Sequence, residues 1–341
     1  MLVYTLRRLL AMIPVLIAAT ILTFVLVDLA GDPILPLRIR VPPVPETTIQ
    51  AMTERLYEDR SSIERYWIWL TGIELPGGFG ANHGDVGILQ GKWGPSISGV
   101  DIGSEIGQRF IVTLRLVLVA TILSFILAIV TGVLSAVKQY SIADHSLTFV
   151  GFLALAMPIF WLAALIKETG VWINGQLNTR IFYTFGATSP GYDRMSFLEK
   201  VLDAGSHLIL PTIALMLNGY AAISRFQRAT MLEVLNSDYI RLARAKGLRN
   251  RVVMRRHALR TALIPVVTLM ALTISGVLTG VVITETIFGW RGLGTFFVAS
   301  VANIDSFAVL AFVLVSGVLV VVSNLVADLL YAVLDPRIRY E

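Results

Sequence analysis

The sequence predicts an all-α integral membrane protein with six transmembrane helices. The chain has 341 residues, of which 55% are hydrophobic and 15% are charged, whereas soluble domains carry roughly 25% charged residues. Its mean hydropathy is +0.74. Six mostly apolar stretches are close to the length of about 20 residues that crosses a bilayer as a helix. They are residues 9–29, 111–137, 147–166, 207–223, 263–287 and 307–333.

The first stretch follows Arg7 and Arg8, as the core of a signal peptide would. Its apolar run is longer than a usual signal core, and Val27–Ala30 makes a poor cleavage site, so we interpret it as a retained anchor. The fourth stretch is the shortest. We expect Pro211 in its first turn, where proline does not break a helix.

The distribution of basic residues predicts the orientation of the helices. With the N-terminus inside, 15 Lys and Arg fall in 64 inner positions, against 12 in 140 outer positions. Because cytoplasmic loops carry the excess of Lys and Arg, both termini are predicted to be cytoplasmic. The same placement beside apolar spans accounts for the net charge of +5 without nucleic-acid binding.

This topology divides the chain into an anchor helix (1–29), an external subdomain (30–110) and a five-helix core (111–341) that contains a cytoplasmic loop (224–262). A linker as long as 30–110 is uncommon unless it has structure or function of its own. Prolines make its start extended, and Thr47–Leu70 has helix-like apolar spacing. A loosely ordered loop is the alternative. A second outer segment, 167–206, is expected to hold a short amphipathic piece near Met195–Leu202.

Several kinds of chemistry have no support in the sequence. The chain has no cysteine, and its four histidines are scattered, so neither a disulfide nor a metal site is expected. A P-loop is also missing, because Gly91-Lys92 is followed by Trp93, and Val86 stands where the first glycine belongs. We therefore expect no catalytic residue, metal or cofactor on this chain.

The densest group of charges lies in the cytoplasmic loop. Glu233–Ala245 has helical periodicity, Gly247 is typical of a helix end, and Arg251–Ala262 is expected to form a second helix. Such a basic segment could bind anionic lipid headgroups at the membrane surface. The small residues Ala243, Ala245 and Gly247 favour a protein partner instead, since a helix without bulk fits a groove.

The fifth stretch contains candidate residues for a transport path. Gly276 and Gly280 have the spacing that lets helices approach closely. Thr273 and Thr279 flank this pair. The face could meet a partner at a gate or pack within one chain. Four charged residues fall near predicted helix ends, where their side chains can reach the membrane surface at little cost and a structural role is the alternative. Glu285, which precedes a glycine-rich turn, is the best functional candidate among them. These four are Asp28, Arg115, Glu285 and Asp328.

The basic loop carries the most specific motif of the chain, Asp238-Tyr239-Ile240-Arg241 followed by Ala243-Arg244-Ala245-Lys246-Gly247. Other motifs stand along nearly the whole chain at Arg7–Leu10, Gly31-Asp32-Pro33, Gly84–Gly87, Glu285–Phe288, Gly292–Gly294, Asp328–Tyr331 and Leu334–Arg337. Together they resemble the motifs of ABC-importer permeases, in the B-type subunit of the dipeptide/oligopeptide permease family. The family usually has proline where Arg291 stands, and 71–83 and 88–103 are expanded, which leaves the substrate open.

The resemblance implies the type I ABC-importer permease fold and a docking element at Asp238–Leu248. Its inserted face would be Tyr239, Ala243, Ala245 and Gly247, and its polar contacts Arg241, Arg244 and Lys246. The implied partners are a second, C-type permease subunit, two P-loop ATPase subunits that bind ATP and Mg, and an extracytoplasmic substrate-binding protein. The implied location is the lipid bilayer of a bacterial or archaeal cytoplasmic membrane.

Two other classes of function remain open at this stage. An ion- or proton-coupled secondary transporter would need an ionisable group near the bilayer midplane, and the sequence places none there. A membrane scaffold would bind lipid or protein through the basic loop without transport. Within the ABC-importer class, relatives that carry nickel, opines, glutathione or oligosaccharides keep the solute undecided between these and di- or oligopeptides.

Overall fold

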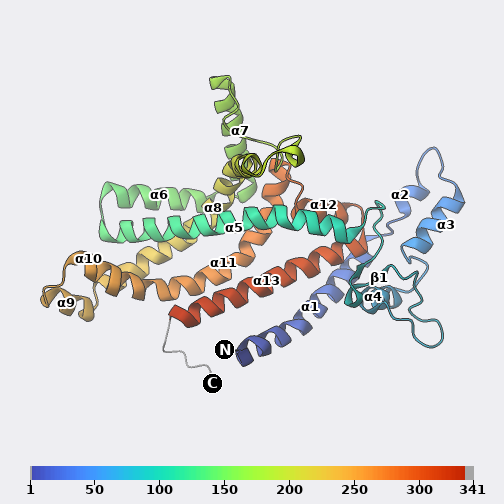
Figure 1. The fold of residues 1–341 in the computed structure, drawn as a ribbon, viewed down its shortest axis with the longest axis horizontal. Coiled ribbons are helices and arrows are strands. Elements are labelled where there is room, and N and C mark those ends of the chain that lie inside the picture. Colours follow the sequence, from blue (N-terminus) through green and yellow to red (C-terminus); the bar gives the residue numbers. More distant parts are fainter. Residues whose placement is uncertain (1, 335–341) are drawn as a thin grey trace. The chain divides into compact units, whose positions relative to one another are not determined.

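A computed structural model describes the backbone of residues 2–334 and the side chains of 6–7, 9–267, 269 and 281–326. The described chain is mostly helical (Figure 1). It divides into two compact units, which we call the N-terminal unit (2–112 with 292–319) and the central unit (113–291 with 320–334). The long helices α5 (Ile102–Val137) and α13 (Ser306–Leu334) run through both.

Helices long and apolar enough to span a membrane support the predicted class. Four helices meet this test singly among the described residues, and six spans result if two bent helix pairs are each counted as one. They include α1 (Leu2–Ala30), α5, α8 (Phe197–Leu235) and α13. The fifth predicted stretch lies within α11 (Leu259–Phe288).

The N-terminal unit packs the segment after α1 into short elements around a core of Trp69, Val86 and Phe307. The single helix expected over Thr47–Leu70 is wrong. The chain turns over Leu56–Ser61, where Tyr57 has a φ of +60° and Ser61 caps the next helix by accepting the amide hydrogen of Glu64. The short elements are α2 (Leu35–Arg38), α3 (Glu46–Arg55), α4 (Ser62–Thr71), β1 (Val86–Gly87), η1 (Ile88–Gln90), β2 (Lys92–Trp93) and α12 (Leu293–Ala302).

A buried arginine ties this segment to α1. Arg65 donates to Asp28 over 3.0 Å and also to Glu58, and its side chain is only 6% exposed. Asp28 accepts a second hydrogen bond from Ser62. Burial raises the pKa of Glu58 above its usual value, while the positive charge of Arg65 acts to lower it. Asp28 thus fastens the segment that follows α1, a structural role.

The start of α13 is held by one carboxylate. Asp305 accepts the amide hydrogen of Ala308, as an N-cap residue does, and also hydrogen bonds from Ser96 (2.7 Å) and from the amide of Ile97 (2.9 Å). Because its carboxyl group is buried, the pKa of Asp305 is raised above its usual value, with these hydrogen bonds opposing the shift. This side chain joins a loop far earlier in the chain to a helix start.

The central unit contains a sharp break in the third predicted span. Instead of one helix over 147–166, the chain forms α6 (Ile142–Ala156) and α7 (Ile159–Leu177). The chain bends by 112° between these two helices. Pro158 causes the break, because the residue before a proline avoids the helical region, and Met157 is extended. Figure 1 shows α7 pointing away from the direction of α6.

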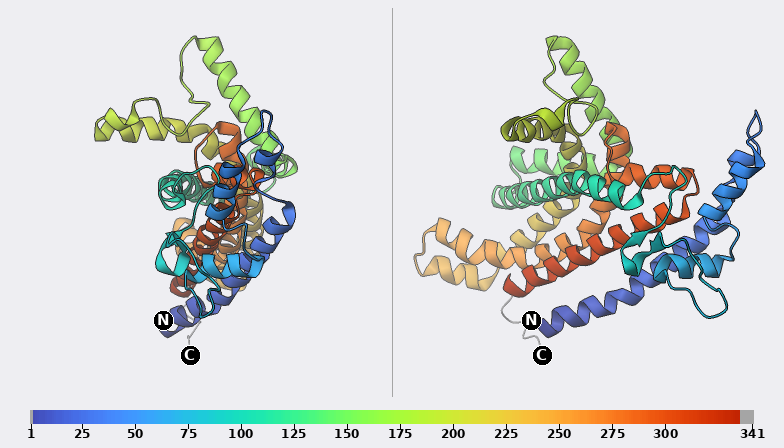
Figure 2. Two further views of the ribbon diagram at one scale, coloured as in Figure 1. Left: turned by 90° about the vertical axis from the view of Figure 1, so that its right-hand side faces the viewer. Right: turned by 45° about the vertical axis from the view of Figure 1, so that its right-hand side comes forward.

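The fourth predicted span belongs to a much longer helix. α8 begins at a capping box formed by Ser196 and Glu199 and continues for 39 residues, so the amphipathic piece near Met195–Leu202 is its first part. Pro211 stands inside this helix, not in its first turn as expected. Figure 2 shows the first turns of α8 running in a different direction from the rest, as the missing amide hydrogen at a proline allows.

Two glycines bring α5 and α8 into close contact. A methyl group at Gly132 would lie 2.7 Å from the carbonyl oxygen of Ser224, and one at Gly219 would lie 2.9 Å from Oγ of Ser124. The contact at Gly132 is with backbone, so the two helices can approach each other there only with glycine, whereas a side chain at Gly219 would have to displace the Ser124 hydroxyl. Ala128 on α5 and Tyr220 on α8 belong to the buried cluster at this crossing.

Candidate functional site

The predicted helix–turn–helix is present between α8 and α11. After α8 ends, Asn236 and Ser237 separate it from α9 (Asp238–Ala245), so the helix expected from Glu233 is broken there. The chain then turns and enters α10 (Asn250–Val252), which continues through a π-helical segment, η3 (Val253–Ala258), into α11. The second helix is therefore the start of α11.

Gly247 ends α9 as the sequence predicts. Its φ is +76°, in the left-handed region that glycine adopts at low cost. The amide of Gly247 donates to the carbonyl of Arg244, and the amide of Leu248 donates to that of Ala243. This pair of bonds is a Schellman motif, which satisfies carbonyls that the helix end leaves open.

The inner face of α9 is apolar and buried. Ile240 (0% exposed) and Ala243 (8% exposed) pack in a cluster with Met231 and Val253. We call the set Ala136, Met231, Ile240, Ala243, Val253, Ala258 and Ala262 the loop core. Ala243, which the sequence places on an inserted face, is turned toward the loop core here, because it follows Ile240 by three residues.

The outer face of α9 and its turn is exposed and basic. Tyr239 and Leu242 are exposed apolar residues on it, and Ala245 and Gly247 are also exposed. Asp238 lies 3.5 Å from Arg241, but both side chains are highly exposed, so this pair contributes little. Other exposed basic side chains of the loop are Arg244, Lys246, Arg249, Arg251, Arg255, Arg256 and Arg260.

The candidate path residues lie on α11. Thr273, Gly276, Thr279 and Gly280 fall outside the residues whose side chains the structure describes. Glu285 is described and fully buried, and it accepts a hydrogen bond from Thr113 of α5. A buried carboxylate at the end of α11 is held in place rather than exposed as a mobile gate.

The segment between α7 and α8 is fastened to the end of α11. The amide of Gly186 donates to the carbonyl of Phe288 (2.9 Å), and beside the segment Lys167 of α7 donates to the carbonyl of Ile287 (2.6 Å). Arg115 donates to the carbonyl of Ala187 and lies over the ring of Trp290. The α7–α8 segment, which also contains η2 (Tyr192–Arg194), thus closes over this end of α11.

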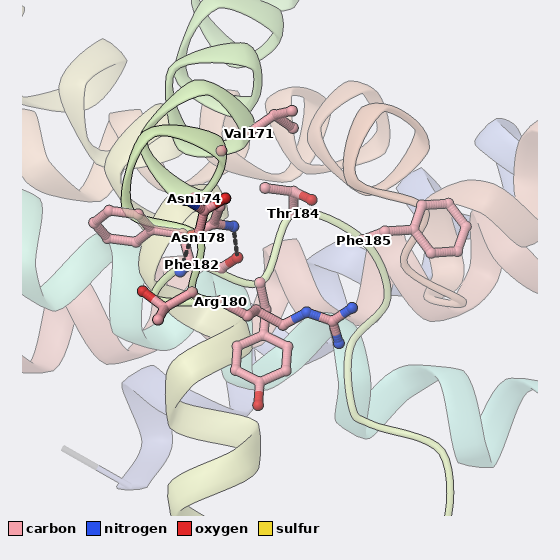
Figure 3. Close-up of a pocket in the computed structure, with 10 residues that line it drawn as sticks. Val171, Asn174, Asn178, Arg180, Phe182, Thr184 and Phe185 are labelled. Carbon is pink, nitrogen blue, oxygen red and sulfur yellow. Dashed lines mark hydrogen bonds between the residues drawn. The ribbon is translucent and has the colours of Figure 1, made fainter.

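A cavity of about 590 Å³ lies beside the same segment. Figure 3 shows Asn174, Asn178 and Arg180 on one part of its wall, with Phe185 at the opposite side. Asn174 accepts the amide hydrogens of Ile181 and Phe182, which shapes this wall. The residues that line the cavity all belong to the end of α7 and to the chain directly after it.

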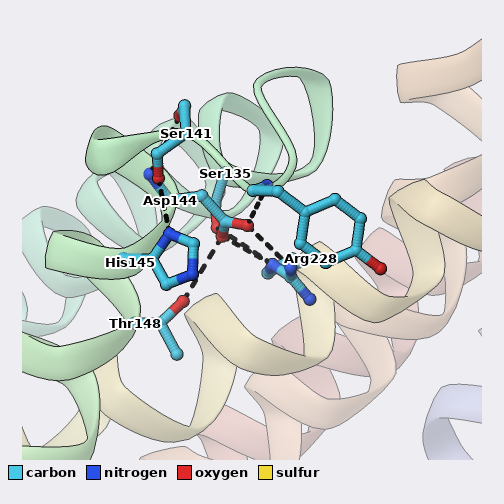
Figure 4. Close-up of polar contacts among 7 residues, drawn as sticks. Ser135, Ser141, Asp144, His145, Thr148 and Arg228 are labelled. Atoms are coloured by element: carbon cyan, nitrogen blue, oxygen red, sulfur yellow. Dashed lines mark hydrogen bonds and ion pairs between the residues drawn. The ribbon is translucent and has the colours of Figure 1, made fainter.

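Sequence reasoning missed a buried ion pair near the loop. Asp144, at the start of α6, accepts two hydrogen bonds of 2.8 Å from Arg228 on α8, and Ser135 on α5 donates to it as well (Figure 4). The sequence offered only one aspartate in the segment 138–146 and one of several arginines in the loop 224–262, two segments expected on the same side of the membrane. Nothing in their spacing indicated that they meet.

Comparisons with known proteins agree with these features. The profile of the family described as binding-protein-dependent transport system inner membrane component matches residues 128–340. The chain is 37% identical to the oligopeptide transport system permease protein OppB of Mycobacterium tuberculosis over 336 residues, covering 98% of each chain. It is also 37% identical to the dipeptide transport system permease protein DppB of Escherichia coli over 353 residues, covering 100% of each.

A solved structure shows the same fold. A chain from inward-facing conformations of the MetNI methionine ABC transporter matches with a TM-score of 0.50 at 16% identity, covering 67% of this chain and 96% of that one. This likeness confirms the predicted type I permease fold. The matches to the family profile and to full-length relatives show that the chain belongs to the family of binding-protein-dependent transport system inner membrane components, the permease subunits of ABC importers.

Proposed function

We propose that this chain is one transmembrane half of an ATP-driven importer of di- or oligopeptides. The exposed basic face of α9 and its turn is the observation that carries the proposal. Transport needs a separate ATPase, because the chain itself has no P-loop sequence. That ATPase docks on the exposed basic face. ATP and Mg are bound by that partner. The oligopeptide and dipeptide permeases that are 37% identical to this chain support the peptide class of substrate.

The docking surface differs from the one expected from the sequence. Because Ala243 is buried, the contact consists of Tyr239 and Leu242 with the turn at Ala245–Gly247. The surrounding arginines and Lys246 supply positive charge that attracts an acidic rim on the ATPase. In this arrangement the loop core keeps α9 attached to α8 and α11, so that a force on the surface reaches the transmembrane helices.

Two further partners are proposed because this chain forms only one half of the transport path. A second, C-type permease completes the path, to which Thr273, Gly276, Thr279 and Gly280 of this chain contribute. A substrate-binding protein docks on the extracytoplasmic side, where the sequence predicts the segment 30–110. The excess of basic residues in and around the docking loop supports cytoplasmic termini. Glu285 supports the path from its buried position beside Thr113.

Native mass spectrometry of the tagged protein, gently extracted from its own membrane, tests this proposal. We expect recovery with a second six-span permease and two P-loop ATPases, and a retained peptide mass would identify the substrate class. Another retained solute, such as nickel, glutathione or an oligosaccharide, would keep the mechanism but replace the substrate. Recovery alone or as a homodimer would overturn the proposal in favour of a secondary transporter or scaffold.

A further inference from the structure

The Asp144 carboxylate joins three helices at one point. Arg228 of α8 donates to its two oxygens from Nε and Nη2, each over 2.8 Å. Ser135 of α5 donates to it and accepts from Arg228 Nε over 3.0 Å. The amide of Tyr140 in the α5–α6 turn donates to it over 2.9 Å. We call Ser135, Asp144 and Arg228 the clamp (Figure 4).

The clamp has the geometry of a rigid connection. The Asp144 side chain is 4% exposed and that of Arg228 is 28% exposed, so solvent screens their attraction only weakly. A guanidinium bound at two points fixes the orientation of both groups, which a single-point contact does not. Removing either partner would leave a charged group without compensation in a site that is largely closed to water.

The clamp lies directly beside the loop core. Ser135 precedes Ala136, a member of the loop core on α5, and Arg228 lies one helical turn before Met231, a member on α8. Ile240 and Ala243 of α9 pack on the same cluster. A displacement of α9 is therefore passed to the ends of α5 and α8 by packing, and the clamp extends this connection to α6.

We propose that the clamp makes α6 move together with the docking loop, so that Asp144 and Arg228 are positioning residues for the coupling of ATP hydrolysis to uptake. This inference rests on the proposed function. It gives α6 a role in coupling that the packing of the loop core does not provide, because that core attaches α9 to α5, α8 and α11 but contains no residue of α6. Without the clamp, α9 still binds the ATPase, but its movement reaches α6 incompletely.

The test compares Arg228→Gln with the matched control Lys138→Gln in the whole transporter reconstituted in liposomes. Lys138 directly follows α5 and is exposed, so its change removes a positive charge from the same region without touching the clamp. We expect Arg228→Gln to retain the ATPases but to hydrolyse about fivefold or more ATP per imported peptide. Lys138→Gln is expected to keep the ratio of the unaltered protein.

Two further variants keep the test decisive if Arg228→Gln is poorly recovered. Arg228→Lys keeps the charge but lacks the two-point geometry, so an intermediate ratio is expected. The double exchange Asp144→Arg with Arg228→Asp restores attraction and should recover part of the coupling. If Arg228→Lys and Arg228→Gln both hydrolyse as much ATP per imported peptide as the unaltered protein, the role of the clamp is refuted.

A distance measurement separates transmission from simple stability. The chain contains no cysteine, so a pair of spin labels can be placed on it by the exchanges Ile142→Cys and Asn250→Cys. Ile142 is 87% exposed at the start of α6, and Asn250 is exposed at the start of α10 in the cytoplasmic loop. We expect one narrow distance in both the nucleotide-free and ATP-bound states, and a broadened one with Arg228→Gln.

The outcomes distinguish the two proposals. If the unaltered chain recovers no ATPase, the proposed function fails and the coupling role of the clamp fails with it. If the assembly hydrolyses ATP and imports peptide, but Arg228→Gln leaves both the ratio and the distance distribution unchanged, the clamp alone is refuted.

Discussion

The turn at Gly247 gives the sharpest test of the docking surface, because backbone strain and charge can be separated there. A methyl group on Gly247 would meet no atom within 4 Å, so a substitution causes no steric clash. Its cost is the φ of +76°, which is about 1–2 kcal/mol for most residues. The two Schellman bonds contribute about 0.5–1.5 kcal/mol each, so this strain is comparable with the stability of the turn.

This strain predicts different results for three substitutions of Gly247. Gly247→Ala should lower the population of the native turn about five- to thirtyfold and weaken docking of the ATPase. Gly247→Asn tolerates the left-handed region and should stay close to the unaltered protein. Gly247→Asp has the same tolerance but places a negative charge in the basic surface, so it should insert normally yet uncouple ATP hydrolysis from uptake.

Peptide uptake and ATP hydrolysis by the reconstituted transporter are the assay, with recovery of the ATPase subunits measured in parallel. The pair Gly247→Asn and Gly247→Asp differs by charge at nearly constant size, and is therefore the decisive comparison. Normal ATP-driven uptake by Gly247→Asp would refute the assignment of this turn to the docking surface. Equal failure of the two variants would attribute the effect to backbone geometry and refute the role of charge.

Three further predictions concern buried and exposed positions. Ile240→Ala, in the loop core, should lower the free energy of unfolding by about 2–5 kcal/mol in thermal unfolding, whereas the exposed Leu242→Ala should leave it unchanged and weaken only ATPase binding. The raised pKa of Asp305 means that the folded state binds this proton more readily than the unfolded state. Its contribution to stability should be greatest at low pH and be lost as the pH rises through the folded pKa, and Asp305→Asn should reduce that slope of melting temperature with pH. Gly289→Ala should destabilise the end of α11 by about 1–3 kcal/mol, because its φ is +64° and its methyl group would overlap Cε2 of Phe185; an unchanged melting temperature would contradict this.

Composition and periodicity predicted the all-α class and the positions of the helices, because the bilayer requires long apolar runs. The loop turn was also predictable, since glycine at a helix end has a local cause in backbone conformation. The break at Met157–Pro158 had a local signal too, in the proline, but the apolar run through it suggested one span. Pro211 shows the reverse case, because it lies inside a continuous helix.

Side-chain partnerships were less accessible from the sequence. Asp144 and Arg228 are 84 positions apart, and their meeting depends on how α6 packs against α8. The direction of Ala243 likewise depends on where α8 and α11 offer an apolar surface. The ion pair of Asp28 with Arg65 required the fold of the segment after α1. These contacts are set by tertiary packing, which local patterns do not encode.

The number of residues in the π-helical segment η3 determines the direction in which α9 faces relative to the axis of α11. Each residue in an α-helix advances the face by about 100°, and a π-helical turn accommodates an extra residue without ending the helix. Deleting one residue within Val253–Ala258 would convert the segment to an ordinary helix and rotate α9 about the axis of α11 by that amount. The docking face would then point away from its partner although every contacting residue remained present.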